Sequence, residues 1–273
     1  MKLNFQFIIL FATLALAPRA SAHEFWIEPT EFQVQKDKPV VADLKNGQLF
    51  KGTRQSFFAD RNTYFNAMIG DRTIAVTGRM GDRPAIQLDA PDMDGLMIIA
   101  HEAAPSSLSY NEWAKFMKFV AHKDFKQAVT IHEARGWPKE GFRETYTRHS
   151  KSLVAVGSGE GSDRALGLAT EFVALDNPYS PELNGTLDVA LFYQGAPRAD
   201  AQIEIYERDS EKTVEVTIQR TDAQGRATIT VKPGFDYMVD AVVLRPTSDG
   251  PIPEGDPVWE TLWASLTFSV PAP

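Results

Sequence analysis

The side chains best suited to chemistry in this chain are its histidines, because the 273-residue sequence contains no cysteine. Without cysteine, thiol nucleophiles and thiolate metal sites are excluded. The G-x-S-x-G, H-E-x-x-H and Walker motifs are also missing from the sequence, so no short catalytic signature is present. Imidazole nitrogens remain as the candidate functional groups, and metal binding is a chemistry that they favour. The histidines are His23, His101, His122, His132 and His149.

His23 differs from the others because cleavage of a signal peptide after Ala22 would make it the first residue of the mature chain. A terminal histidine offers a metal ion two nitrogens in one compact chelate ring, the α-amine and the ring Nδ1. The amine has a pKa of about 8 when free, and metal binding releases its proton. Nitrogen ligands suit nickel, cobalt, copper and zinc. Phe25 and Trp26 follow as apolar residues that can hold the terminus against the fold.

His101 and His149 are the candidates for further ligands of the same ion. His101 directly follows the apolar segment 96–100, which predicts a position at the end of a strand, where side chains often face binding sites. His149 lies in a polar segment just before a second apolar run, 153–156. A surface loop position for His101 and a structural role for His149 fit the same pattern, so these alternatives stay open.

One helical stretch is predicted over residues 109–135. Ser109 and Glu112 have the S-x-x-E spacing of a capping box, and apolar residues then recur at helical spacing. The sequence Gly136-Trp137-Pro138 predicts the end of the stretch.

Two of the histidines lie on this helical stretch. His122 and His132 are ten residues apart, so they point in directions that differ by about 80°, at 100° per residue. We expect both to be solvated. We also expect Glu144, which follows the stretch, to be an ordinary surface charge.

The C-terminal part, residues 168–273, is predicted to form an antiparallel β-sandwich. Apolar residues alternate with polar or small ones in six short segments, which is the period of a half-buried strand. Turn sequences such as Pro233-Gly234 separate the segments. The inward face is predicted to include Leu187, Val189, Ile203, Ile229 and Phe268.

The N-terminal part, residues 23–160, is also predicted to be rich in short strands, which glycines interrupt. Residues 157–163 (GSGEGSD) have the composition of a flexible linker. We therefore expect a mainly β protein of two domains. The first is a β-rich domain that carries the helical stretch, and the second is an Ig-like or transthyretin-like antiparallel sandwich.

Residues 1–22 have the pattern of a secretory signal peptide. Lys2 precedes an apolar run over residues 5–16, and Ala20-Ser21-Ala22 is a small-x-small cleavage site. This run is shorter than the roughly 20 residues that span a bilayer, so we expect cleavage rather than a stable membrane anchor. The mature protein is expected to be exported, and periplasmic in a Gram-negative cell. A net charge of −8 argues against nucleic acid as a partner.

The sequence resembles one known family, domain-of-unknown-function family 4198, over essentially all of the mature chain. Four groups of residues carry the resemblance: His23-Glu-Phe-Trp26 with Pro29; the segment 143–151 (RETYTRHSK); the segments 176–179 (DNPY), 192–197 (FYQGAP) and 221–226 (TDAQGR); and the segment 259–268 (WETLWASLTF). Members are often described as periplasmic components of nickel or cobalt uptake. The resemblance therefore implies metal handling, and the position carried over from it is His23.

These observations predict a periplasmic binding protein for a divalent transition metal, with no catalytic activity. Nickel or cobalt is the expected ion, copper or zinc is the alternative, and His23, His101 and His149 are the candidate ligands. The expected partner is a membrane metal transporter that receives the ion. Two other functions fit the sequence. One is a copper enzyme in which the terminal histidine forms a brace with a second histidine, and the other is an adhesion or carbohydrate-binding sandwich in which His23 is incidental.

Overall fold

The computed structural model describes residues 23–273, so the predicted signal peptide lies outside the described residues. This part of the chain is mainly β. Its largest sheet is built from long strands, several of which are buried on both faces. The strands are β5 (Asn62–Ile69), β6 (Arg72–Ala75), β8 (Gly95–Ala103), β10 (Phe142–Val156), β14 (Gln202–Arg208), β15 (Val214–Arg220), β17 (Asp236–Pro246) and β18 (Pro257–Ser269), with the short strands β2 (Gln33–Val34) and β9 (Ser106–Tyr110) paired to β10.

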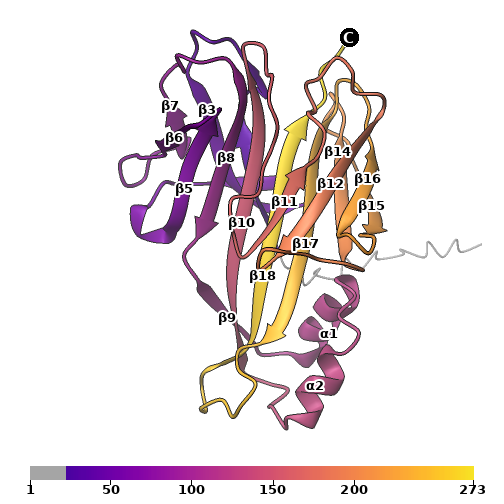
Figure 1. Ribbon diagram of the computed structural model, residues 1–273. Helices are drawn as coiled ribbons and strands as arrows, with labels where there is room; N and C mark the ends of the chain where they lie inside the picture. The colour runs from indigo at the N-terminus through magenta and orange to yellow at the C-terminus, as the bar shows by residue number, and fades with distance from the viewer. Residues whose placement is uncertain (1–22) are drawn as a thin grey trace, which may run out of the picture.

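The order of the strands in this central sheet is β15-β14-β17-β18-β10-β8-β5-β6. Figure 1 shows β5, β8, β10, β18 and β17 side by side along the length of the molecule. Most neighbours are antiparallel, but β10 and β18 run parallel and join the two halves of the chain. The predicted parts 23–160 and 168–273 therefore share one continuous sheet.

Two smaller sheets cover opposite faces of the central sheet. The first comprises β1 (Glu24–Pro29), β3 (Val40–Gln48), β4 (Lys51–Gln55) and β7 (Ile86–Leu88). The second comprises β11 (Thr170–Ala174), β12 (Thr186–Tyr193), β13 (Ala196–Pro197) and β16 (Arg226–Thr230). Because successive side chains of a strand point to opposite faces, neighbouring residues of β10 pack into different cores. Leu153 packs in the core under the second sheet, and Val154 packs in the core under the first.

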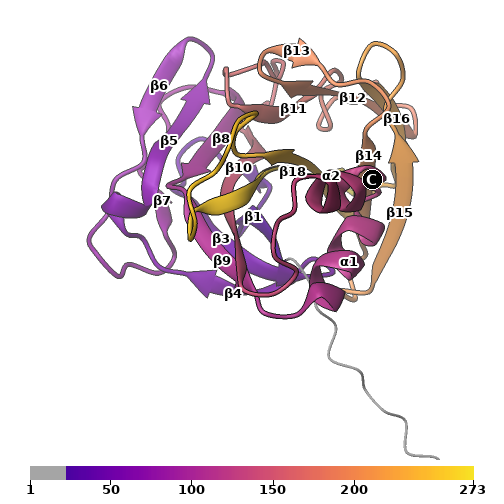
Figure 2. The ribbon, with the colours of Figure 1, turned by 90° about the horizontal axis from the view of Figure 1, so that it is seen from below.

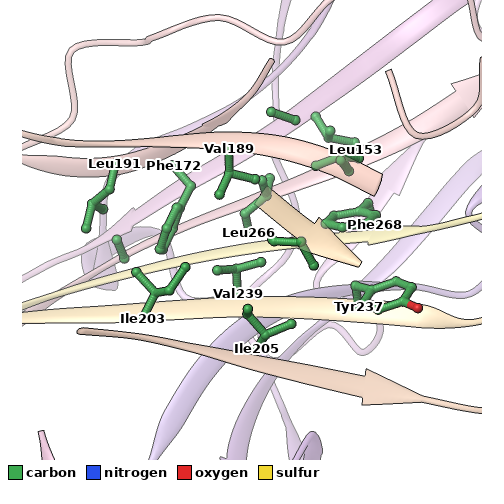
Figure 3. Packing of buried hydrophobic residues seen from close by; sticks show 14 of the residues in the cluster. Leu153, Phe172, Val189, Leu191, Ile203, Ile205, Tyr237, Val239, Leu266 and Phe268 are labelled. Atoms are coloured by element: carbon green, nitrogen blue, oxygen red, sulfur yellow. The ribbon is translucent and has the colours of Figure 1, made fainter. Parts of the chain in front are cut away.

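The core of the C-terminal sandwich follows the predicted alternation. Leu187, Val189, Ile203, Ile229 and Phe268 are all buried in one apolar cluster, which confirms the predicted inward face. Figure 3 shows Val189, Ile203 and Phe268 in this cluster. The central and second sheets meet through these side chains. On the opposite face of β14, Glu204 is buried too, so this strand is buried on both faces.

The helical stretch forms two helices, α1 (Trp113–His122) and α2 (Ala128–Ala134), at one end of the molecule (Figure 1). The end of α1 lies beside β14 and β15, as the view from below shows (Figure 2). The predicted capping box is wrong, because Ser109 belongs to β9 and the N-cap residue Glu112 makes no side-chain cap hydrogen bond. A short 3-10 helix, η1 (Ala59–Arg61), lies in the N-terminal part. Within residues 23–273, no helix is long and apolar enough to cross a membrane.

His132 on α2 is fully buried, so the expectation that it is solvated is wrong. Its Nδ1 accepts a hydrogen bond from the indole of Trp259 at 3.0 Å, and its Nε2 donates to the carbonyl of Pro138, also at 3.0 Å. The ring also packs against Trp113 and Phe142. One ring nitrogen therefore ties α2 to β18, and the other ties it to the connection that leads to β10.

The residues after β10 form a fixed connection rather than a flexible linker. Lys151, a buried residue of β10, donates from Nζ to the Asp163 carboxylate at 2.8 Å and to the carbonyls of Arg164 and Phe172. Glu171 lies 3.7 Å from the same ammonium and accepts hydrogen bonds from backbone N–H groups of residues 166–168. The ammonium and two carboxylates thus hold this segment against the core.

Candidate functional site

His23 lies at the rim of a cavity of about 470 Å³. The cavity is lined by residues of β3, β9 and α1, by the first half of β10 and by Trp263 in the middle of β18. Polar and aromatic side chains share its wall with His23. Those used below are Tyr110, Lys115, Glu144, Tyr146, Arg148 and Trp263.

Strand β1 fixes the position of His23, because it begins at the next residue. It pairs with β3 from Glu24 opposite Gly47 to Pro29 opposite Ala42. The Glu24 side chain is buried and accepts a hydrogen bond from the Tyr206 hydroxyl at 3.1 Å. Trp26 is fully buried. Residue 23 is therefore directly bonded to a residue that is buried in the fold.

Glu144 is a buried carboxyl group in the wall of this cavity, so the expectation of a surface charge is wrong. Its two oxygens accept hydrogen bonds from the hydroxyls of Tyr110, at 2.9 Å, and Thr261, at 2.5 Å. Burial raises the pKa of Glu144 to about 7, although both hydrogen bonds act in the opposite direction. This carboxyl can therefore take up or release a proton near neutral pH.

Arg148 lines both the His23 cavity and a second cavity of about 660 Å³, as Asn46 and Tyr146 do. Its guanidinium lies 5.0 Å from the ring centre of Tyr146, 5.6 Å from that of Phe25 and 5.9 Å from that of Trp263. Its Nε is buried without a hydrogen-bond partner, and within residues 23–273 no carboxylate oxygen lies within 4.0 Å of the guanidinium. Aromatic faces rather than an ion pair therefore hold this cation.

His101 lies inside β8 rather than at its end, and it lines the second cavity. It is 2% exposed, between the rings of Phe65 and Phe25. Its Nε2 is 2.8 Å from Asn62 Oδ1, while its Nδ1 is buried with no partner. Burial lowers its pKa to about 3, so the imidazole is neutral at physiological pH.

His149 is buried on the other face of the central sheet. Its Nδ1 lies 3.0 Å from the carbonyl oxygen of Trp263, and its Nε2 lies 3.6 Å from a carboxylate oxygen of Glu102. Glu102 adjoins His101 on β8, so the two side chains point to opposite faces. The sheet thus separates His149 from His101, and neither lines the cavity of His23.

The described residues hold no ready-made metal cage. Between His23 and Pro273, no three histidine, aspartate or glutamate side chains gather closely enough to hold an ion.

A buried charged cluster joins α1 to the central sheet beside these cavities. Lys123, directly after α1, lies 2.9 Å from a carboxylate oxygen of Glu204 and 2.9 Å from one of Asp240. His122 adds a 3.2 Å contact to Glu204. Burial disfavours the ammonium of Lys123, but the two carboxylates outweigh it and raise the Lys123 pKa. Burial and the Asp240 charge raise the pKa of nearby Glu24 to about 7.

Comparison with family models gives one match, to the family described as domain of unknown function DUF4198, over residues 20–245. This range covers most of the chain. The protein belongs to the DUF4198 family. No curated protein matches the sequence.

Solved structures similar to this DUF4198 protein show only remote likeness. They include the D0-D1 domain of intimin (13% identity, TM-score 0.21, 89% of this chain and 97% of that chain). A tetra-tandem repeat from the extending region of a large adhesion protein has 10% identity and a TM-score of 0.22, over 90% of this chain and 49% of the other. The Yersinia pseudotuberculosis adhesin InvE has 9% identity and a TM-score of 0.21, over 90% and 58%. At these scores they support no functional argument.

The sequence placed His23 at the candidate site of this DUF4198 protein but missed Glu144 and Arg148. In their segment, 142–149, buried and half-buried positions alternate except at residues 145 and 146, which are both half-buried, and most residues are polar. A period-two test that scores side chains by polarity therefore gives no signal here. The sequence feature that could have indicated these residues is the tyrosine Tyr146 among charged residues, just before an apolar run.

Glu144→Gln is expected to stabilise the protein relative to wild type as the pH rises from 5 to 8. The unfolded Glu144 ionises near the ordinary glutamate pKa of 4.5, whereas the folded one stays protonated up to about 7. The free energy of unfolding of the wild type therefore falls as the pH rises between these two pKa values. The fall is about 1.4 kcal/mol per pH unit, or about 3 kcal/mol in all. The glutamine of the variant does not ionise, so its stability does not fall in this way. Urea denaturation at both pH values measures the difference. Exposed Glu140→Gln is the control, and a pH-independent difference for Glu144→Gln would contradict the raised pKa.

Proposed function

We propose that this protein binds a divalent transition metal ion through His23, with nickel or cobalt first and copper or zinc as alternatives. In this proposal it is an exported, periplasmic protein that passes the ion to a membrane transporter. The observation that supports the proposal is the fixed position of residue 23 at the rim of a polar cavity, one residue before a buried strand. A ligand held in place loses little conformational freedom when it binds.

The donor set fits a two-nitrogen chelate with open positions. Signal cleavage after Ala22 supplies the free amine, and Nδ1 of the same residue closes the chelate ring. Oxygen donors of Glu144, Tyr110 and Tyr146 line the same cavity. Glu144 already accepts two hydrogen bonds, so the terminal nitrogens are the primary ligands in this proposal.

Two cations in the cavity wall bear on which form of the metal binds. Arg148 and Lys115 both line the cavity; Lys115 is paired with Glu112 at 2.7 Å, so Arg148 is the cation that most opposes a bare dication. The same two groups attract the anions that can fill the open positions of a bound ion. The proposal therefore favours a metal ion that keeps an anionic ligand over a bare, hydrated one.

The two alternative functions make different demands on the site. A copper brace needs a nitrogen from a second histidine, and the described residues that line this cavity include no histidine besides His23. A metal-independent adhesion or carbohydrate-binding role needs no ligand at His23. Absence of metal binding by the processed protein would favour that role.

Nickel affinity is expected to depend on the free amine of His23. Three proteins are compared by isothermal titration with Ni²⁺: the chain that begins at His23, the same chain with one extra N-terminal glycine, and His23→Ala. The glycine keeps the imidazole but converts the amine to an amide, a far poorer ligand. We expect a loss of about a hundredfold in affinity for each altered protein, since one good ligand is worth about 2–3 kcal/mol.

The control for this experiment is His122→Ala, because His122 is a half-exposed histidine outside the cavity, and its affinity should match wild type. Intact mass must first show that the secreted chain begins at His23. Copper is avoided because a terminal Gly-His binds it through a different chelate. Equal nickel affinity of the mature and glycine-extended chains would show that the amine is not a ligand.

A further inference from the structure

The larger cavity beside Arg148 concentrates positive charge in an acidic protein. It has a volume of about 660 Å³, within the usual range for small-molecule sites. Arg61, Arg83 and Arg148 line it, and Asp60 is the acidic residue among the described residues that do so. The sequence as a whole carries a net charge of −8. The lining of the cavity is therefore positively charged, whereas the chain as a whole is negatively charged.

None of these three arginines is neutralised by a carboxylate within 4.0 Å in the part of the chain that the structure describes. Arg61 lies over the ring of Phe58, 4.6 Å from its centre, and Arg83 donates from Nε to the Ser56 hydroxyl at 2.6 Å. Arg148 is held by aromatic rings, as described above. Their guanidinium N–H groups thus remain available to bind anionic oxygens.

A buried acceptor without a partner accompanies these donors. Asn62 donates from Nδ2 to the carbonyl of Phe58 at 2.9 Å, which turns its Oδ1 toward His101. Nε2 of the neutral His101 ring must therefore carry the hydrogen, and Nδ1 is left as a lone-pair acceptor. This atom has no hydrogen-bond partner in the structure. An unpartnered buried acceptor is costly, and a hydroxyl or amine from a ligand would satisfy it.

We propose that this cavity binds a small organic polyanion whose carboxylate or phosphate groups pair with Arg61, Arg83 and Arg148 and whose hydroxyl donates to His101 Nδ1. Guanidinium groups bind both kinds of anion through paired hydrogen bonds. The rings of Phe25 and Phe58 belong to the apolar part of the wall. Arg148 borders both cavities, but the proposal does not depend on metal binding at His23, because none of its ligand groups is a proposed metal ligand.

The test is isothermal titration of metal-free protein at constant ionic strength with citrate, tricarballylate, acetate and inorganic phosphate. Citrate carries three carboxylates and a hydroxyl, tricarballylate lacks only the hydroxyl, and acetate has a single carboxylate. We expect saturable citrate binding, about tenfold weaker tricarballylate binding and no measurable acetate binding. Tighter binding of phosphate than of citrate would support the anion site and assign it to phosphorylated ligands.

Variants identify the site that the anion uses. Arg61→Gln and Arg83→Gln change exposed side chains, so they should fold, and each is expected to weaken citrate binding about tenfold or more, as loss of a charge-assisted hydrogen bond does. Arg148→Gln should have at least the same effect. The control is Arg226→Gln, an exposed arginine on β16 in the other small sheet, which should bind like wild type.

Three results would overturn the proposal or a part of it. Failure of citrate, tricarballylate and phosphate all to bind saturably would remove the anion site. Citrate binding that is unchanged in Arg61→Gln and Arg83→Gln would place the anion elsewhere. Equal affinities for citrate and tricarballylate would remove the role of His101 Nδ1.

Discussion

Lys123→Met is expected to destabilise the protein by about 3–5 kcal/mol, which is typical for removal of one partner from a buried ion pair. The Lys123 ammonium is the cation between Glu204 and Asp240, and the side chains of these two carboxylates are only 2% and 1% exposed. They face each other across the pairing of β14 with β17. Without the lysine, like charges adjoin in a medium that solvates neither. Urea denaturation measures the loss.

The control is Lys118→Met, because Lys118 is exposed on the same helix and its loss should have little effect. Neutralising both carboxylates in the same chain, with Glu204→Gln and Asp240→Asn, should restore most of the lost stability. The loss in Lys123→Met should also shrink at pH 5, since the stranded carboxyls can then protonate. If Lys123→Met alone were as stable as the Lys118→Met control, the cluster would not hold α1 to the sheet.

Lys151→Met should cause a loss of similar size, about 3–5 kcal/mol. Its ammonium neutralises Asp163 and Glu171 and donates to two backbone carbonyls, and it is 1% exposed. Methionine fills the volume but leaves a buried aspartate that still accepts the backbone N–H of Ala174. The segment that precedes β11 should then loosen, which limited proteolysis and amide exchange within residues 161–169 would detect.

The rescue variant for this second cluster adds Asp163→Asn to Lys151→Met. It removes the stranded charge and should recover part of the stability. Lys51→Met, an exposed change on β4, is the control. Protection of residues 161–169 that is unchanged in Lys151→Met would contradict the assigned role of the ammonium.

Strands with one solvent-exposed face could be predicted from the sequence. On β12, Leu187 and Val189 are buried, whereas Thr186 is exposed and Asp188 is half-buried, so the period of two is visible. In contrast, β10 is buried on both faces over its second half, and Ser150, Lys151 and Ser152 lie inside it. Polar residues buried by partners from distant segments leave no periodic pattern.

The candidate site could be predicted only in part for the same reason. His23 was identified because its chemistry depends on its place in the sequence. The burial of Glu144, Glu204 and His132 depends instead on hydroxyl, ammonium and indole groups more than 75 residues away along the chain. Single-sequence reasoning treats such residues as solvated because their partners cannot be paired without the fold.

The parallel pairing of β10 with β18 also sets the order in which this protein can be assembled. Strand β18 lies between β17 and β10, in the interior of the central sheet, and Ser265 on β18 contacts Ser150, 115 residues earlier. A nascent chain that has not yet reached residues 257–269 therefore exposes the hydrogen-bonding edges of both β10 and β17. Such open edges are where chains pair with the wrong partner. The central sheet therefore cannot close until residues 257–269 have been synthesised. A chaperone that binds the nascent chain must cover the open edges of β10 and β17 until that point.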